Sequence, residues 1–188
     1  MVRHGETEDN IKKIFSRDTT SLTLKGINQI KSIKEDIEGL NFSKVYYSPL
    51  TRTKETIKYL ELEGIMENRI KEIDFGIFSG KNYETISKKY PWESRMWVEN
   101  PITYNIPGGE SLEMVYSRLK NFLDELIGRD ENILLITHEG IIRLACCWVF
   151  DNINYFFKFK ADNGSISTIS IVDDYKYISK LNYNPRLK

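Results

Sequence analysis

Apolar residues follow two different spacings along the chain, and the two spacings alternate. Short apolar runs, typical of buried strands, lie at residues 1–2, 45–47 and 133–136. Apolar positions three to four residues apart, typical of one helix face, lie at residues 24–37, 112–126 and from Ile141 onward. A further strand is expected over residues 69–73, and Ser48-Pro49-Leu50 indicates another helix start. Strands that alternate with helices predict a layered α/β fold with right-handed crossovers.

The last part of the chain has the alternating pattern of a β-hairpin. Residues 166–171 place every second side chain on the same face of an extended strand, and residues 175–181 are expected to pair with them across Asp173-Asp174. Two hydroxyl residues are placed to cap helices, Thr23 before residues 24–37 and Ser111 before residues 112–126.

Residues 74–109 have no clear period and are rich in aromatic side chains and proline. Such a segment between regular elements often forms a lid or the wall of a pocket. The alternative is a cluster of aromatic side chains that pack with one another beneath a loop. The two interpretations are compatible, and we expect one domain over residues 1–188 that includes this segment.

Composition excludes several classes of partner. Lys and Arg balance Asp and Glu at 27 each, so the net charge does not favour nucleic acid or an anionic membrane surface. No apolar run approaches the roughly 20 residues of a membrane helix, because the longest, from Ile141 to Phe150, contains Arg143. Without a signal-peptide pattern, we expect a cytoplasmic protein.

The two cysteines, Cys146 and Cys147, are adjacent and lie in an apolar stretch. Neighbouring residues are poorly placed for disulfide geometry, so we expect reduced core residues. A metal or redox site of two adjacent thiols is the alternative, although no Cys and His spacing fits a zinc site.

The chain holds only two histidines, and each follows an expected strand. His4 lies in Met-Val-Arg-His-Gly-Glu-Thr, and His138 ends the run Asn-Ile-Leu-Leu-Ile-Thr-His-Glu-Gly. Ligands of parallel sheets gather beyond the carboxyl ends of the strands. Two imidazoles beside the guanidinium of Arg3 favour chemistry on an anion, most plausibly phosphate.

Further motifs follow in order along the chain: Ser48-Pro-Leu-Thr-Arg-Thr53, Glu72-Ile-Asp-Phe-Gly-Ile-Phe-Ser-Gly80, Pro107-Gly-Gly-Glu-Ser111 and Thr137-His-Glu-Gly-Ile-Ile-Arg143. Together with Arg3-His4-Gly5-Glu6-Thr7, they make the chain resemble the histidine phosphatase superfamily, which is related to cofactor-dependent phosphoglycerate mutase. The resemblance implies a three-layer α/β/α sandwich with a mostly parallel central sheet. Within this family, the short span between the Phe-Gly and Pro-Gly-Gly-Glu-Ser motifs looks most like the α-ribazole phosphatases of cobalamin assembly.

The resemblance assigns a role to each candidate residue. It makes His4 the nucleophile that becomes phosphohistidine and Glu72 the proton donor. The side chains of Arg3, Arg52 and His138 would surround the phosphoryl group. The side-chain amide of Asn10 would donate a hydrogen bond to it. We expect Thr137 and Glu139 to contact substrate as well. The substrate would be a small phosphorylated metabolite and the product inorganic phosphate, with no cofactor or metal, because side chains supply the cations.

Physical chemistry supports these roles. A neutral imidazole is a competent nucleophile, and nearby Arg3 and Arg52 would lower the pKa of His4 and favour the neutral form. The other ring nitrogen is expected to be held by a carbonyl near Gly5, whose lack of a side chain lets the backbone come close to the ring. Glu72 can donate a proton if an apolar setting raises its pKa.

Structural alternatives exist for most of these residues. Arg52 would be a surface residue, His138 a core histidine, Asn10 a turn residue and Thr137 a strand end. Asp74 and Glu110 are rival acids, although Glu110-Ser111 is most simply the start of a helix.

Three departures bear on activity and specificity. Only Met1 and Val2 precede the Arg-His pair, and so short a strand should weaken the sheet below the nucleophile. Glu139 stands where a small residue is common, and its carboxylate would repel phosphate unless it turns away or pairs. The Trp-Glu usual after Phe-Gly is absent. A phosphoglycerate mutase and a non-catalytic phosphate-binding module are the alternative functions, and the oligomeric state stays open.

Overall fold

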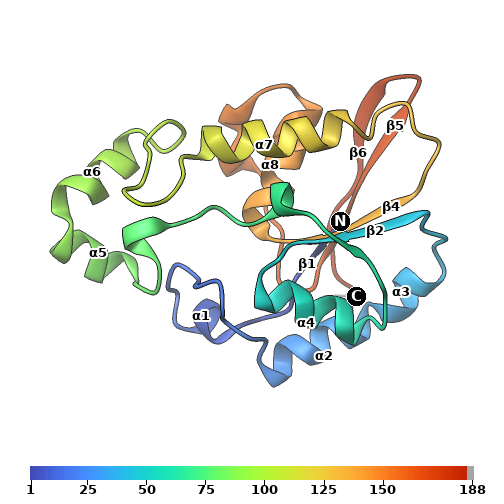
Figure 1. The fold of residues 1–188 in the computed structure, drawn as a ribbon, viewed down its shortest axis with the longest axis horizontal. Helices are drawn as coiled ribbons and strands as arrows, with labels where there is room; N and C mark the ends of the chain where they lie inside the picture. The colour runs from blue at the N-terminus through green and yellow to red at the C-terminus, as the bar shows by residue number, and fades with distance from the viewer. Residues whose placement is uncertain (186–188) are drawn as a thin grey trace.

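A computed structural model describes residues 1–185, and within them six strands form one sheet (Figure 1). Their order across the sheet is β3-β2-β4-β1-β5-β6. The bounds are β1 Val2–Arg3, β2 Lys44–Tyr47, β3 Ile65–Met66, β4 Ile133–Thr137, β5 Ile166–Val172 and β6 Tyr175–Tyr183. The strands β3, β2, β4 and β1 pair in parallel, whereas β5 pairs antiparallel with both β1 and β6. The mostly parallel α/β sheet is therefore confirmed.

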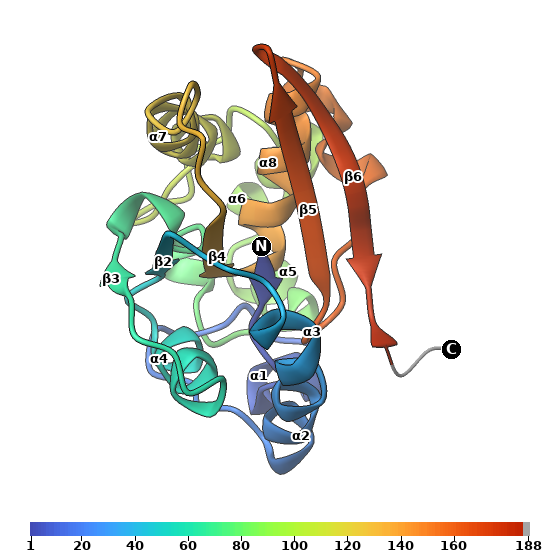
Figure 2. The ribbon, with the colours of Figure 1, turned by 90° about the vertical axis from the view of Figure 1, so that its right-hand side faces the viewer.

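One layer of helices covers the first face of the sheet. It consists of α2 Leu24–Ser32, α3 Lys34–Glu38 and α4 Thr51–Tyr59, which lie together below the sheet in Figure 2. Their buried apolar side chains, such as Ile30 and Ile57, form one cluster with Val2, Leu134 and Ile136 of the sheet. The helix expected over residues 24–37 is interrupted at Ile33, which ends α2 and begins α3.

The opposite face is covered by α7 Leu112–Asp124 and α8 Glu139–Val149. Their apolar faces form the larger core cluster, which includes Leu119, Trp148 and Leu135 of β4. Leu134 and Ile136 point to the first cluster and Leu135 to the second, as the two-residue period of a strand buried on both faces requires. The chain is therefore the expected three-layer sandwich.

The segment at residues 74–109 is more regular than its sequence indicates. It holds α5 Tyr83–Lys89 and α6 Pro91–Glu99, which lie at one end of the molecule beside α1, Glu8–Ile11 (Figure 1). Phe15 anchors the segment, because its ring lies 4.8 Å from that of Phe75 and 5.4 Å from that of Trp97. An aromatic cluster is thus present, and a lid or pocket-wall role stays a prediction.

The strand expected over residues 69–73 is wrong. The short strand is β3, followed by the 3₁₀ turn η1 at Asn68–Ile70, with an extended loop after it. Two more 3₁₀ turns are η2 at Gly76–Phe78 and η3 at Ile153–Lys158. The charged pattern of Arg69 and Lys71 suits this exposed edge of the molecule better than a buried strand.

Helix caps and cysteines agree with the sequence. The side chains of Thr23 and Ser111 accept hydrogen bonds from the backbone N–H groups of Gly26 and Met114. Both cysteines are buried and free, and burial raises the pKa of Cys146 to about 12 and that of Cys147 to about 11. Across residues 1–185, no helix has both the length and the apolar character needed to cross a membrane.

Candidate active site

The register of the central strands brings the two histidines together. Strands β1 and β4 are parallel neighbours, with Arg3 opposite Thr137. The next residue of each strand is a histidine, and the His4 backbone N–H donates to the Thr137 carbonyl at 3.0 Å. The two imidazole centroids lie 5.2 Å apart, and both rings are buried. The strand ends therefore converge on one small polar space.

The hydrogen bonds of His4 define its tautomer. Its Nδ1 lies 2.7 Å from the carbonyl oxygen of Gly5, which can only accept, so Nδ1 carries the proton. Its Nε2 accepts from Arg52 Nε at 3.2 Å. The lone pair of Nε2 therefore faces the shared space, which is the arrangement that a nucleophilic imidazole needs.

His138 is held in the opposite tautomer. Its Nδ1 accepts from the same Arg52 Nε at 3.2 Å, which leaves the proton on Nε2. That nitrogen donates to the hydroxyl oxygen of Ser48 at 2.7 Å. Ser48 directly follows β2, the other neighbour of β4, so three adjacent strand ends contribute to the site. Ser48 belongs to one of the sequence motifs, but nothing in that motif indicated its contact with His138.

Arg52 connects the two rings from the first turn of α4. It is only 2% exposed, which excludes the surface interpretation. Its Nη1 donates to the carbonyl of Arg17 at 3.0 Å. That carbonyl is fixed by the fully buried carboxylate of Asp9, which accepts from the Arg17 backbone N–H at 3.0 Å and from the Thr20 hydroxyl. Asp9 thus positions Arg52, a role that the sequence gave no signal for.

Both histidines are neutral at pH 7. Burial lowers the pKa of His4 well below its ordinary value, and the charges of Arg52 and Arg3 lower it further. Burial and Arg52 act in the same way on the pKa of His138. The expected effect of the two arginines on His4 is confirmed, although loss of solvation is the larger cause.

Glu72 lies on the loop after η1, next to the start of α8. Its carboxylate oxygens accept from the backbone N–H groups of Ile73 at 3.2 Å and Gly140 at 3.4 Å. Burial raises its pKa above the ordinary value and outweighs the opposing effect of Arg52. Glu72 therefore has the raised pKa that a proton donor needs.

A second arginine fixes the backbone of Glu72. Arg118 of α7 donates to the carbonyl oxygens of Arg69 at 2.8 Å and of Glu72 at 3.2 Å. It is paired with Glu110 at 2.9 Å, whose carboxylate also accepts from the backbone N–H of Asp74. The carboxylate of Glu110 is thus occupied by Arg118 and the Asp74 backbone, and it is not available as the acid. Arg118 was missed because nothing in its helical pattern separates it from a surface residue.

Asn10 lies beside the loop that follows His4. Its amide oxygen accepts from the backbone N–H of Thr7 at 3.1 Å and from Asn163 Nδ2 at 3.1 Å. Asn163 Nδ2 also lies 3.3 Å from the carbonyl oxygens of His4 and of Gly5. Because the oxygen of Asn10 is engaged, its NH₂ group is the part that can donate to an anion. Asn163 was missed, although Asn163-Gly164 is a typical turn signal.

Arg3 and Glu139 form an ion pair at the edge of the site. Arg3 Nη1 lies 2.9 Å from Glu139 Oε2 and donates to the carbonyl of Ala161 at 2.6 Å. Arg3 Nε is buried and has no hydrogen-bond partner within residues 1–185. Arg143, four residues after Glu139, lies 3.8 Å from its carboxylate. Glu139 is therefore paired, as the sequence analysis required of a carboxylate beside a phosphate site.

The predicted substrate contact of Thr137 is not supported. Its hydroxyl donates to the carbonyl of Ile70 at 2.8 Å and is fully buried, so the proton is already used. The strand-end interpretation fits instead, because this hydrogen bond ties β4 to η1.

A second close approach, besides the one to the His4 ring, requires glycine at position 5. A Cβ atom on Gly5 would lie 2.3 Å from the carbonyl oxygen of Gly26, and one on Gly26 would lie 2.1 Å from that of Glu6. The loop that follows His4 therefore crosses α2 where the backbones of Gly5 and Gly26 touch. The close approach is to a helix backbone, in addition to any approach to phosphate.

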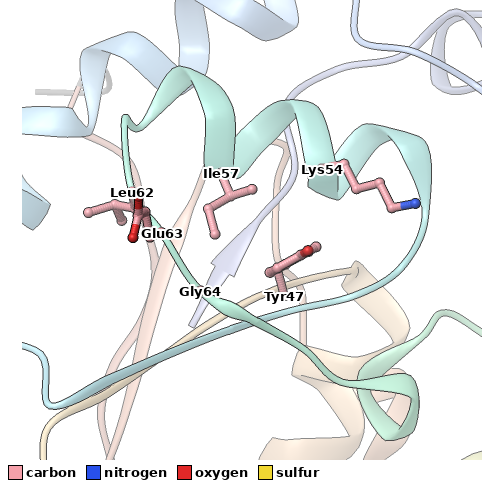
Figure 3. Close-up of a pocket in the computed structure, with 6 residues that line it drawn as sticks. All are labelled: Tyr47, Lys54, Ile57, Leu62, Glu63 and Gly64. Atoms are coloured by element: carbon pink, nitrogen blue, oxygen red, sulfur yellow. The ribbon is translucent and has the colours of Figure 1, made fainter.

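A surface hollow of about 510 Å³ lies apart from the histidines, between α4 and the β2–β3 edge (Figure 3). It is lined by Tyr47, Lys54, Ile57, Leu62, Glu63 and Gly64. Lys54 is its one cation and Glu63 adds a carboxylate at the other end (Figure 3), so the hollow lacks the set of anion-binding groups found around His4.

The family model of the histidine phosphatase superfamily (branch 1) matches residues 1–184. The chain belongs to this superfamily. It is 34% identical to phosphoserine phosphatase 1 of Hydrogenobacter thermophilus over an alignment of 190 positions that covers 97% of this chain and 90% of that protein. The chain is thus a phosphatase, as its two-histidine site indicates.

Two further similarities differ in sequence identity and in how much of the other protein they cover. The chain is 34% identical to the fructose-2,6-bisphosphatase of Saccharomyces cerevisiae over 147 residues, 76% of this chain, but this spans about a third (32%) of that protein. The crystal structure of the α-ribazole phosphatase from Shigella flexneri matches with a TM-score of 0.91 at 22% identity, covering 97% of this chain and 95% of that one. At this identity, the second similarity establishes the fold alone.

Proposed function

We propose that this phosphatase is a metal-independent phosphomonoesterase that acts on a small phosphorylated metabolite through a phosphohistidine on His4. The observation that carries the proposal is the shared donor Arg52 Nε, 3.2 Å from both His4 Nε2 and His138 Nδ1. This donor supports the proposal because it joins the Nε2 lone pair of His4, a second imidazole and a guanidinium around one point. Arg3 and the NH₂ group of Asn10 complete the set of anion-binding groups.

In the first step, His4 Nε2 attacks phosphorus and the bond from phosphorus to the ester oxygen breaks. Glu72 gives its proton to the departing oxygen. In the second step, water attacks phosphorus and the bond from phosphorus to His4 Nε2 breaks, while Glu72, now ionised, takes a proton from the attacking water. Inorganic phosphate leaves, and both His4 and Glu72 return to their starting states.

Arg3 and Arg52 stabilise the charge that spreads over the equatorial oxygens of the transferring group. Loss of one such preorganised donor typically raises a barrier by about 3–4 kcal/mol. General acid catalysis of the kind proposed for Glu72 typically contributes ~10²–10⁴ in rate. These two contributions are separable, because one acts on the phosphoryl group and the other on the leaving group.

Two substrates are candidates. α-Ribazole 5′-phosphate is suggested by the short span after Glu72 and by its aromatic side chains, which would suit a flat base. Phosphoserine is favoured by the 34% identity to a phosphoserine phosphatase over nearly the full length of both chains. The two differ in the group beside the ester, a ribose with its base in one case and a small amino acid in the other.

A phosphoglycerate mutase needs cationic side chains that bind the carboxylate of its substrate. Of the four cations between Glu72 and α7, Lys89 lies over the ring of Tyr90, and the other three have polar partners nearby instead. Lys88 and Arg95 form ion pairs with Glu84 and Glu99 on their own helices, at 2.6 Å and 2.8 Å. Lys81 donates to the carbonyl of Ile77 at 2.8 Å. These contacts favour hydrolysis over phosphoryl transfer between positions of a carboxylated substrate.

The test is a set of initial-rate assays with an aryl phosphate, phosphoserine, α-ribazole 5′-phosphate, and 3-phosphoglycerate with its bisphosphate primer. We expect phosphate release without isomerisation, and no turnover by His4→Ala. Efficient isomerisation would identify a mutase. Tight phosphate binding without turnover would identify a non-catalytic module, and turnover by His4→Ala would exclude His4 as the nucleophile.

A further inference from the structure

We propose that Glu139 determines specificity: it favours phosphomonoesters whose leaving alcohol carries an ammonium group and disfavours those that carry a second anion. The inference rests on the proposed function and narrows its substrate class to phosphates of amino alcohols.

Glu139 stands beside the space that the leaving group must occupy. The leaving oxygen has to lie next to Glu72, which protonates it. Glu72 is in turn packed against Gly140, because a Cβ atom there would lie 2.4 Å from Glu72 Oε1. Glu139 is the preceding residue, and its side chain is about one third exposed. Its carboxylate is therefore partly exposed, on the residue that precedes the one packed against Glu72.

The pairing with Arg3 keeps this carboxylate in place when phosphate binds. Arg3 uses Nη1 for Glu139 and for the carbonyl of Ala161. Its buried Nε has no partner within the described residues 1–185, so that N–H remains for a phosphoryl oxygen. Arg3 can thus hold phosphate and Glu139 together, and the carboxylate need not move away. A negative charge then stays close to every bound substrate.

The charges of the site make Glu139 selective. Arg3 and Arg52 attract the phosphoryl group of any substrate, whereas the two histidines are neutral. Glu139 adds a carboxylate beside Arg3, at 2.9 Å, with Arg143 at 3.8 Å on its other oxygen. Discrimination by charge acts through attraction of the wanted partner and repulsion of the unwanted one. An ammonium group gains from Glu139, and a carboxylate or second phosphate is repelled by it.

The test compares two primary alkyl phosphates of opposite side charge, O-phosphoethanolamine and 3-phosphoglycerate, with an aryl phosphate as the neutral reference. We expect the wild-type enzyme to prefer phosphoethanolamine in kcat/KM. Glu139→Gln should lower the ratio of the two kcat/KM values about tenfold, as expected for loss of a charge at short range in a partly exposed site. Glu139→Asp, which keeps the charge, should retain most of the preference.

Glu84→Gln is the matched control. Glu84 also lies in the first turn of a helix and pairs with a cation four residues later, but on α5. This variant should keep the wild-type ratio. A ratio unchanged within twofold in Glu139→Gln, or an equal loss on all three substrates, would overturn the proposal, because Glu139 would then only hold Arg3. Hydrolysis of the aryl phosphate by the wild-type enzyme separates this failure from failure of the proposed function.

Discussion

Glu72 is the residue whose protonation governs the proposed first step. Replacing it with Gln removes the transferable proton but keeps the shape and a hydrogen-bonding oxygen. We expect kcat for alkyl phosphates to fall by ~10²–10⁴, because an alkoxide is a poor leaving group without a proton. Aryl phosphates with acidic phenols should lose much less. Initial rates on matched alkyl and aryl esters measure the difference, and equal losses would count against Glu72 as the acid.

The same substitution has a consequence for stability. The pKa of Glu72 is raised in the folded protein, so above its ordinary pKa of about 4.5 the folded state holds a proton that the unfolded state releases. The contribution of Glu72 to stability is therefore present at low pH and decreases as pH rises. In Glu72→Gln this loss is absent, so its Tm relative to wild type should increase from pH 4 to pH 7.5. A constant difference would argue against a raised pKa.

The sequence predicted the candidate residues around the two histidines better than the residues that position them through hydrogen bonds. His4, Arg52 and His138 stand out because their types and neighbours are unusual for a structural role. Asp9 and Arg118 do not, because a charged residue in a polar stretch is ordinary. Their importance arises from hydrogen bonds to backbone carbonyls of distant residues, and no local pattern encodes such contacts. For the same reason, the proton of Thr137 could not be assigned before its partner Ile70 was known.

At the scale of elements, the close approach of the loop after His4 to α2 is the contact that we expect to tolerate substitution least. We expect Gly26→Ala to lower the free energy of unfolding by about 1–3 kcal/mol through overpacking, although Ala is the better helix former. Displacement of the adjacent His4 loop should reduce kcat about tenfold or more. Thermal unfolding and initial rates with an aryl phosphate provide the two measurements.

Gly39→Ala is the control for this prediction. Gly39 ends α3, and a Cβ atom there would have only the carbonyl oxygen of Glu35 near it, at 4.0 Å. This variant should match or slightly exceed the wild-type Tm and keep its kcat. If Gly26→Ala behaved in the same way, the close approach of the loop to α2 would not be a constraint on the site.

Element prediction succeeded where the hydrophobic period was strong and failed where it was not. The apolar spacing of residues 112–126 and the hairpin at Asp173-Asp174 correspond to α7 and to β5–β6. The helices α5 and α6 were missed because each buries a single residue, Ile86 and Ser94, so neither shows a regular apolar stripe, and Trp97 of α6 packs against Phe15 instead. The break at Ile33 was missed because an apolar residue there continues the period.

At the scale of the whole molecule, the site depends on the order of the strands. The carboxyl ends of β2, β4 and β1 supply Ser48, His138 and His4 side by side, although Ser48 and His138 are 90 residues apart in the sequence. The pattern alone predicts that strands end in polar residues, and the family resemblance adds which strands are neighbours. The two-residue length of β1 is compensated by partners on both sides, β4 and β5.

The phosphorylated intermediate provides the most direct measurement. Wild-type enzyme in steady-state turnover with an aryl phosphate should be quenched in alkali, where phosphohistidine survives, then mapped by mass spectrometry and ³¹P NMR. Because Nδ1 of His4 is held by the Gly5 carbonyl at 2.7 Å, we expect a single phosphohistidine, on His4 and bonded through Nε2. Turnover without this intermediate, or phosphate on Nδ1 or on another residue, would contradict the proposed site.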